Sequence, residues 1–143
     1  MEWIAVVLAL AASFDGSQGA KHPQAVHLGE SFVLRAGDSA RVEAEKLEIT
    51  FDTVASDSRC PKGAQCIVEG DAVVRITAGK GKARTTHDLH TSERAGQDAT
   101  VDGFAIVLVR LDPYPVEGRK IEPGDYEATL QVTRGSSGGS VNP

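Results

Sequence analysis

The chain of 143 residues fits one domain with one core, since single domains commonly hold roughly 100 to 200 residues. Hydrophobic residues make up 41% and charged residues 24%, which is enough apolar material for a folded core. The formal net charge of -5 comes from acidic and basic residues that are interspersed. Proteins that bind nucleic acid concentrate Lys and Arg on one face, so this composition argues against a nucleic-acid partner.

An apolar run from Ile4 to Ala12 lies at the start of the chain. It has the length of the hydrophobic segment of an export signal and is too short to span a bilayer. Small residues follow, with a cleavage point after Ala20, whereas Glu2 departs from the usual basic start of such signals. A buried N-terminal segment and a start site further upstream are the alternatives. We expect a signal peptide at residues 1–20 and a periplasmic or extracellular mature protein that does not span the membrane.

After residue 30 the hydrophobic period is mostly two, and the segments 47–51, 72–78 and 126–132 have the pattern of half-buried strands. Further strands are expected at 31–35, 40–43, 82–89 and 104–111. The first two flank a turn at 36–39, and the glycine-rich turn at 79–81 predicts a hairpin. The dense apolar run at 104–111 predicts a central strand covered on both faces.

Short strands separated by Gly, Pro and Asp turns are typical of an antiparallel sandwich or barrel. We expect a small antiparallel β-sandwich, Ig-like in general architecture, with one disulfide-closed loop. Its domain is expected at residues 21–134. The remaining segment, GSSGGSVNP at 135–143, predicts a flexible tail because it has too few apolar residues to offset its ordering entropy.

Cys60 and Cys66 are the only cysteines of the chain, so an intramolecular disulfide has one connectivity. Pro61 and Gly63 lie between them and favour a tight turn. The spacing differs from the C-x-x-C of thiol oxidoreductases, and two thiolates fall short of the four ligands of structural zinc. The pair therefore predicts a structural disulfide, with a stabilisation of about 2 to 2.5 kcal/mol.

The run DSRCPKGAQCIVEGDAVV at 57–74 resembles the motif D-S-R-C-P-x-x-x-x-C-x-W-x-G-x-A-x-V. This motif belongs to a family of bacterial secreted or lipoprotein-like β domains whose role is uncharacterised. Residues 112–115 and 125–126 are similar to the closing segments of that family, so the resemblance covers roughly 29 to 134. Val68 stands where the family has Trp, so a role that the family gives to this Trp does not carry over to the present chain. The resemblance implies a small exported β domain, and it transfers no catalytic activity and leaves the function open.

His87 and His90 are candidate metal ligands, since neutral imidazole binds zinc or copper. Residues three apart on a strand point to opposite faces, so the two could share one ion only at a bulge or turn. Exposed polar positions on a hairpin are the favoured interpretation. We expect no cofactor and no functional metal.

Three carboxylates, Asp57, Glu69 and Asp71, bracket the cysteine loop and could act as an acid and base. Turn formers and solvated strand ends are the more common roles of such residues. Asp57 is also placed to tie the loop to the sheet through a charge-assisted hydrogen bond with Arg59. No catalytic residue is predicted, because no nucleophile elbow, zinc-protease motif or phosphate-binding glycine loop is present.

Arg59, Lys62 and Gln65 predict a binding loop, in which a rigid turn is presented to a partner protein or envelope ligand. A protease inhibitor with Lys62 entering a basic-specific pocket is one form of this hypothesis. The sequence thus favours a non-enzymatic binding or accessory module. The alternative is a metal-dependent or hydrolytic enzyme whose site is assembled from residues distant in the sequence.

Overall fold

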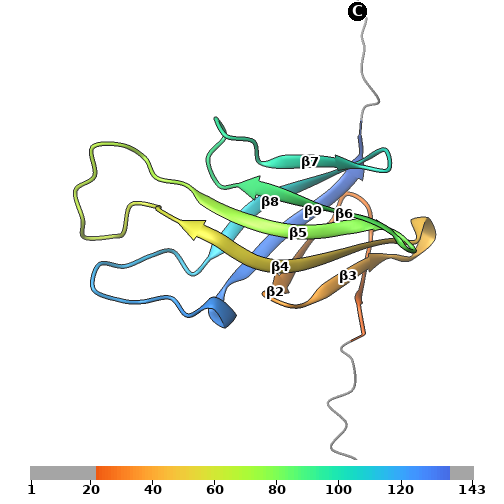
Figure 1. The fold of residues 1–143 in the computed structure, drawn as a ribbon, viewed down its shortest axis with the longest axis horizontal. Coiled ribbons are helices and arrows are strands. Elements are labelled where there is room, and N and C mark those ends of the chain that lie inside the picture. Colours follow the sequence, from red (N-terminus) through yellow and green to blue (C-terminus); the bar gives the residue numbers. More distant parts are fainter. Residues whose placement is uncertain (1–21, 136–143) are drawn as a thin grey trace, which may run out of the picture.

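The computed structural model describes residues 22–135, which form two packed β-sheets (Figure 1). The expected signal peptide at 1–20 lies outside the described residues, as do residues 136–143 of the expected tail. Gly135, the first residue of that expected tail, donates a backbone hydrogen bond of 2.9 Å to Gly103. No helix within residues 22–135 is long and apolar enough to cross a membrane.

The strands and two short 3-10 turns follow one another without any α-helix in the described part of the chain. The strands are β1 Gln24–Val26, β2 Ser31–Arg35, β3 Ser39–Val42, β4 Leu47–Asp57, β5 Ala72–Lys80, β6 Ala83–His90, β7 Asp98–Val101, β8 Phe104–Asp112 and β9 Glu127–Arg134. The 3-10 turns are η1 Glu43–Glu45 and η2 Pro123–Asp125.

One sheet has the strand order β1-β3-β4-β5-β6 and the other has the order β2-β9-β8-β7. All neighbours pair antiparallel except β1 and β3, which are parallel. The expected small all-β sandwich is therefore confirmed, with one parallel pair at the edge.

The core lies between the inner faces of the two sheets, and it consists of the apolar residues at every second position of the strands. Along β4, Leu47, Ile49 and Phe51 are fully buried, while the residues between them are partly exposed. β5 and β9 show the same alternation, so the strands expected at 47–51, 72–78 and 126–132 are confirmed. The side chains buried most completely are Phe51, Leu34, Leu47, Ile49, Ile76, Leu89, Ile106, Leu130, Val74 and Val132.

The expectation that 104–111 forms a strand covered on both faces is wrong. β8 lies between β9 and β7, but only one of its faces is buried, and Val109 is exposed on the other. A register shift between Leu108 and Arg110 marks a β-bulge at this point. The apolar residues of the outer face thus produced a run that resembles a fully buried strand.

Three further details differ from the expected strands. The hairpin at 79–81 is confirmed, but β5 continues through Lys80, and Gly81 and Lys82 form the turn. The segments 31–35 and 40–43 belong to different sheets, because β2 pairs with β9 and β3 with β4. β1 and β7 were not expected, since three or four residues carry too little alternation to be recognised.

The two ends of the sandwich differ in their connections. Two long loops, at 58–71 and 113–122, project side by side from one end, which is the left side of Figure 1. The turn between β5 and β6 lies at the opposite end. An isolated bridge joins Lys62 to Val116, so the two loops are in contact. We call the end that carries them the disulfide end.

Candidate functional site

The loop at 58–71 contains the expected disulfide between Cys60 and Cys66, whose Cα atoms lie 6.0 Å apart. Gly63, within the closed turn, has a φ of +96°, a left-handed conformation that costs glycine little. The backbone N–H of Ala64 donates to the carbonyl of Pro61 at 3.1 Å, which tightens the same turn. The structural disulfide predicted from the spacing is confirmed.

The base of this loop is a narrow neck formed by Ser58 and Asp71. The backbone N–H of Ser58 donates to the Asp71 carbonyl at 2.7 Å, and the backbone N–H of Asp71 donates to Ser58 Oγ at 3.1 Å. Gly70 passes so close that a Cβ atom there would lie 1.6 Å from the Ser58 carbonyl oxygen. The neck therefore requires glycine at position 70.

Asp57 and Arg59 form a bidentate ion pair at the point where β4 leaves the sheet. Arg59 Nε lies 2.9 Å from Asp57 Oδ1, and one terminal nitrogen lies 2.8 Å from Oδ2. The Tyr126 hydroxyl donates to the same Oδ2 at 2.9 Å. The charge-assisted bond expected between Asp57 and Arg59 is present, and its exposed side-chain fractions of 13% and 7% make it a buried pair.

Burial alone disfavours the ionised Asp57 carboxylate, but the hydrogen bonds from Arg59 and Tyr126 outweigh burial. The pKa of Asp57 therefore lies below its ordinary value. Burial and the bond to Asp57 raise the pKa of Tyr126 to about 12. At neutral pH the Asp57 carboxylate therefore stays charged, and the Tyr126 hydroxyl stays protonated.

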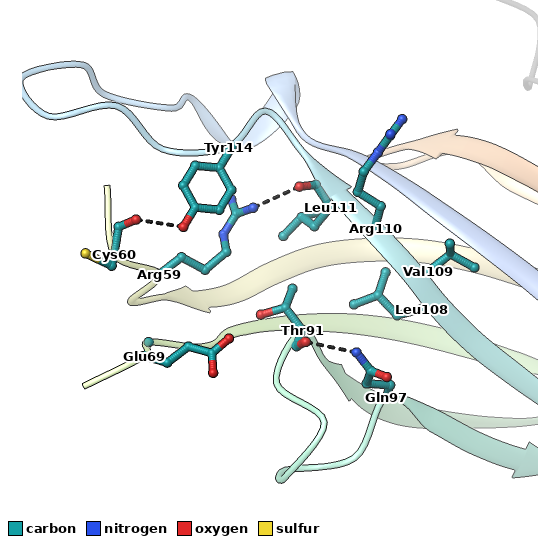
Figure 2. A pocket seen from close by; sticks show the side chains of 11 residues that line it. Arg59, Cys60, Glu69, Thr91, Gln97, Leu108, Val109, Arg110, Leu111 and Tyr114 are labelled. Atoms are coloured by element: carbon teal, nitrogen blue, oxygen red, sulfur yellow. Dashed lines mark hydrogen bonds between the residues drawn. The ribbon is translucent and has the colours of Figure 1, made fainter. Parts of the chain in front are cut away.

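Arg59 also connects the two long loops. It donates to the carbonyl of Leu111 at 2.8 Å and to that of Pro113 at 3.0 Å. Its guanidinium carbon lies 5.5 Å from the centre of the Tyr114 ring, and the Tyr114 hydroxyl donates to the Cys60 carbonyl at 2.8 Å (Figure 2). Arg59 was expected on the presented face of a binding loop, but it is only 8% exposed and supports the loop from within.

Lys62 and Gln65, the other two residues of the expected binding loop, are exposed. The main chain of Lys62 is fully paired, since its N–H donates to Pro115 at 2.9 Å and its carbonyl accepts from Glu117 at 3.0 Å. Its ammonium lies 5.8 Å from the centre of the Tyr114 ring. An inhibitor loop that pairs its backbone with a protease needs free groups at this position, so the geometry disfavours that use of Lys62.

Four apolar side chains are exposed on the two loops. Ile67 is fully exposed and Val68 exposes 74% of its surface, directly after Cys66. Tyr114 and Val116 are exposed on the neighbouring loop, at 45% and 38%. We call these four residues the apolar tip. The sequence contained Ile67 and Val68 as a plain apolar pair, and nothing in the pattern marked them as exposed.

Beside the apolar tip, a cavity of about 240 Å³ opens between the two sheets (Figure 2). Its lining comes from β8, from the two long loops and from the segment that joins β6 to β7. The lining residues are Arg59, Cys60, Glu69, Gly70, Thr91, Gln97, Leu108, Val109, Arg110, Leu111 and Tyr114. Sequence reasoning identified only the loop members, because the others come from positions 91 to 111, which become neighbours through the fold.

The candidate carboxylates have separate partners. Asp71 Oδ2 lies 2.6 Å from Nδ1 of His90, and Asp71 Oδ1 accepts from the backbone N–H of Ser92 at 3.0 Å. Burial opposes ionisation of Asp71, but the bonds from His90 and Ser92 prevail, so the pKa of Asp71 is lowered. Glu69 lines the cavity, and no ion pair or hydrogen bond within residues 22–135 engages it. Asp57 and Asp71 therefore have different partners, and Glu69 has none among the described residues.

His87 and His90 are on opposite sides of β6. His87 has the parity of the buried Leu89 and lies 2.6 Å from the Thr85 hydroxyl, while His90 contacts Asp71. In the described range 22–135, no group of three or more His, Cys, Asp or Glu side chains could hold a metal ion. His90 contacts Asp71 of the neck, which was not expected when His90 was interpreted as an exposed polar residue of a hairpin.

The fold and its disulfide-closed loop define a small all-β sandwich. Comparison of the chain with known proteins found no matching family model, no matching curated protein and no matching solved structure. The resemblance of residues 57–74 to a bacterial secreted domain motif therefore stays a prediction.

Proposed function

We propose that this chain is a non-enzymatic binding module that contacts a partner protein through its disulfide end. The observation that carries the proposal is the apolar tip, in which Ile67 and Val68 are exposed on a loop that is held by a disulfide. Exposed apolar side chains on loops next to a cavity are typical of interaction sites.

The support beneath the tip explains how it would bind without a large loss of entropy. The disulfide and the buried pair of Asp57 and Arg59 stabilise the loop at 58–71. The bridge from Lys62 to Val116 and the hydrogen bond from Arg59 to the Pro113 carbonyl join it to the loop at 113–122. A loop fixed before binding loses less conformational freedom when the partner arrives, so more of the contact energy appears as affinity. Rigid loops on a stiff sandwich commonly serve recognition.

We also infer that the module works in the periplasm or outside the cell, because disulfides persist in oxidising compartments. The apolar run at Ile4 to Ala12 supports this inference. Protein recovered from such a compartment should begin near Lys21. An intact Met1 on exported protein would contradict cleavage after Ala20.

The binding proposal is tested by site-specific photo-crosslinking in the native compartment. A crosslinker at Val68 should capture one discrete partner, whereas the same crosslinker at Val33, an exposed valine on β2, should not. Unlabelled wild-type protein should compete for the capture. The Ile67→Ser, Val68→Ser variant should compete poorly, and the matched Val33→Ser variant should compete like the wild type.

Equal competition by the two variants would overturn the assignment of the apolar tip. The crosslinker could instead capture a second copy of the chain. If the apparent mass of the protein then rises with concentration, and falls in the Ile67→Ser, Val68→Ser variant, the apolar tip serves self-association and not a foreign partner. Stoichiometric metal with hydrolytic activity in protein from its native compartment would instead favour the enzyme alternative.

A further inference from the structure

The cavity beside the apolar tip has two chemically different walls (Figure 2). Leu108, Val109 and Leu111 of β8 and the ring of Tyr114 give it an apolar wall. Glu69 lies on the opposite side, with Thr91 and Gln97 next to it. At about 240 Å³ the cavity is smaller than the roughly 300 to 1,000 Å³ of cofactor and drug sites, so its size suits one large side chain.

The charges around the cavity favour a cationic occupant. Arg59 is neutralised by its two bonds to Asp57, and its guanidinium donates its other hydrogen bonds to the main-chain carbonyls of Leu111 and Pro113. Arg110 Nε lies 2.7 Å from Asp112 Oδ2, so its charge is paired as well. Glu69 is the cavity carboxylate that lacks a cation among the described residues. An anion placed here would meet an unpaired negative charge and two occupied guanidinium groups.

The free hydrogen-bonding groups are mainly acceptors. The Gln97 amide donates through Nε2 to the Thr91 carbonyl at 3.0 Å, and Gln97 Oε1 accepts no bond within residues 22–135. The two Glu69 carboxylate oxygens are acceptors only. A ligand that brings several donors would satisfy these oxygens.

Glu69 also stands at a boundary between apolar and polar surroundings. Together with Thr91 and Gln97 it lines a second hollow of about 420 Å³, whose other lining residues are Ser92, Glu93 and Arg94. A side chain with an aliphatic stem and a charged end matches this sequence of environments, because the stem covers apolar surface while the charge stays near polar groups.

We propose that the cavity accepts an arginine side chain of the partner protein, with its stem on Val109 and Tyr114 and its guanidinium on Glu69. Arginine is preferred to lysine because its planar, weakly hydrated guanidinium offers five donors and binds carboxylates in bidentate fashion. This inference rests on the proposed binding function and names the chemistry of the group that the site recognises.

The test compares two capped peptides, Leu-Arg-Leu and Leu-citrulline-Leu, which differ in charge but hardly in shape. In an NMR titration of the full chain, the arginine peptide should shift the amide signals of Glu69, Gln97 and Val109. The citrulline peptide should bind about fivefold more weakly, the upper range for a partly exposed ion pair. Glu69→Gln should remove the difference between the peptides, and the matched control Glu30→Gln, which precedes β2 at the other edge of its sheet, should retain it.

Absence of binding by the arginine peptide, equal affinity for both peptides, or an undiminished preference for arginine in Glu69→Gln would each overturn the arginine site. None of these results depends on the crosslinking experiment with the apolar tip. If the tip variants still lose the captured partner, the proposed binding function stands and only its arginine recognition fails. If the peptides discriminate as expected while the tip variants compete like wild type, the site at Glu69 stands and the role of the apolar tip fails.

Discussion

The two ends of the sandwich connect their strands in opposite ways. At one end Gly81 and Lys82 alone join β5 to β6, and Asp102 and Gly103 alone join β7 to β8. Both residues of the second turn have positive φ, the conformation that matches the twist of paired strands. At the disulfide end the loops at 58–71 and 113–122 are long, and side chains from distant positions hold them. Short turns depend on local backbone preferences, whereas long loops need tertiary contacts to offset their ordering entropy.

The polar residues that hold the disulfide end differ in role from those on the outer face of the sheet. At the disulfide end, Asp57 and Arg59 are buried, Asp71 and His90 are partly buried, and hydrogen bonds of these residues bridge segments that lie far apart in the sequence. On the outer face of β5 and β6, the pair of Arg75 and Asp88 is exposed, with 44% and 40% of the side chains accessible. Substitutions at the two places should therefore differ in their effect on stability even when the lost contact is the same.

The largest effect is expected from Arg59→Met. The substitution leaves the Asp57 carboxylate without its cation in a buried site, which should cost about 3 to 5 kcal/mol of unfolding free energy. The matched control Arg75→Met removes an exposed pair and should leave the urea unfolding midpoint nearly unchanged. Adding Asp57→Leu to Arg59→Met should recover part of the loss, since no unpaired charge then remains. A double variant no more stable than Arg59→Met would show that the ion pair is not the source.

Removal of the disulfide should have the next largest effect. The Cys60→Ser, Cys66→Ser variant should fold and lose roughly 2 kcal/mol, because the unfolded chain regains the freedom of the closed loop. Hydrogen exchange should rise at residues 58–71 and stay unchanged at the turn between β5 and β6. Reduction of the wild-type protein is the control and should give the same loss. An unchanged unfolding midpoint would mean that Arg59 and the neck hold the loop without the disulfide.

Acid should weaken the disulfide end before the other end. The pKa values of Asp57 and Asp71 are lowered in the folded state, so the unfolded chain binds more protons at low pH. Their contribution to stability is present above the ordinary pKa of aspartate and declines as pH falls below about 4. Unfolding midpoints measured between about pH 6 and pH 3 should fall less steeply in Asp71→Asn than in the wild type. Identical slopes would argue against the bonds to Asp71 in solution.

The smallest effects on stability are expected from substitutions of the two histidines of β6, and they should differ between the two. His90→Gln removes the contact with Asp71 at the neck and should cost less than about 1 kcal/mol, because the pair is partly exposed. His87→Gln should stay within about 0.5 kcal/mol. Thermal unfolding of the two single variants makes the comparison. Zinc or copper bound in stoichiometric amount and lost in either variant would restore the metal hypothesis.

The sequence predicted the sandwich because alternation survives wherever one face of a strand is buried. β4, β5 and β9 were found in this way, β6 followed from the glycine-rich turn before it, and the disulfide followed from having only two cysteines close together. The outer face of β8 was misassigned because valine at positions 107 and 109 is compatible both with burial under a second layer and with exposure to solvent. A single sequence carries the hydrophobicity of a side chain but not its neighbours across a sheet.

The candidate site was predictable only in its local part. The bond between Asp57 and Arg59 was expected because the two opposite charges lie two positions apart and can meet within one turn. The contacts of Arg59 with Leu111 and Pro113 span more than fifty positions, as do those of Tyr126, and no periodic pattern records such distances. The cavity lies in the same category, since Glu69 and Gln97 face it only after both sheets have packed.

The neck formed by Ser58, Gly70 and Asp71 divides the molecule into a frame and an insert. Its hydrogen bonds join the two ends of the loop at the sheet, and the apolar residues 67 and 68 lie beyond this closure. Substitutions at residues 67 and 68 should therefore leave the packing of the sheets unchanged. A combinatorial library could therefore vary Gln65, Ile67 and Val68 while Gly70 and the cysteines stay fixed. The chain would then serve as a scaffold on which new binding specificities are selected at constant fold.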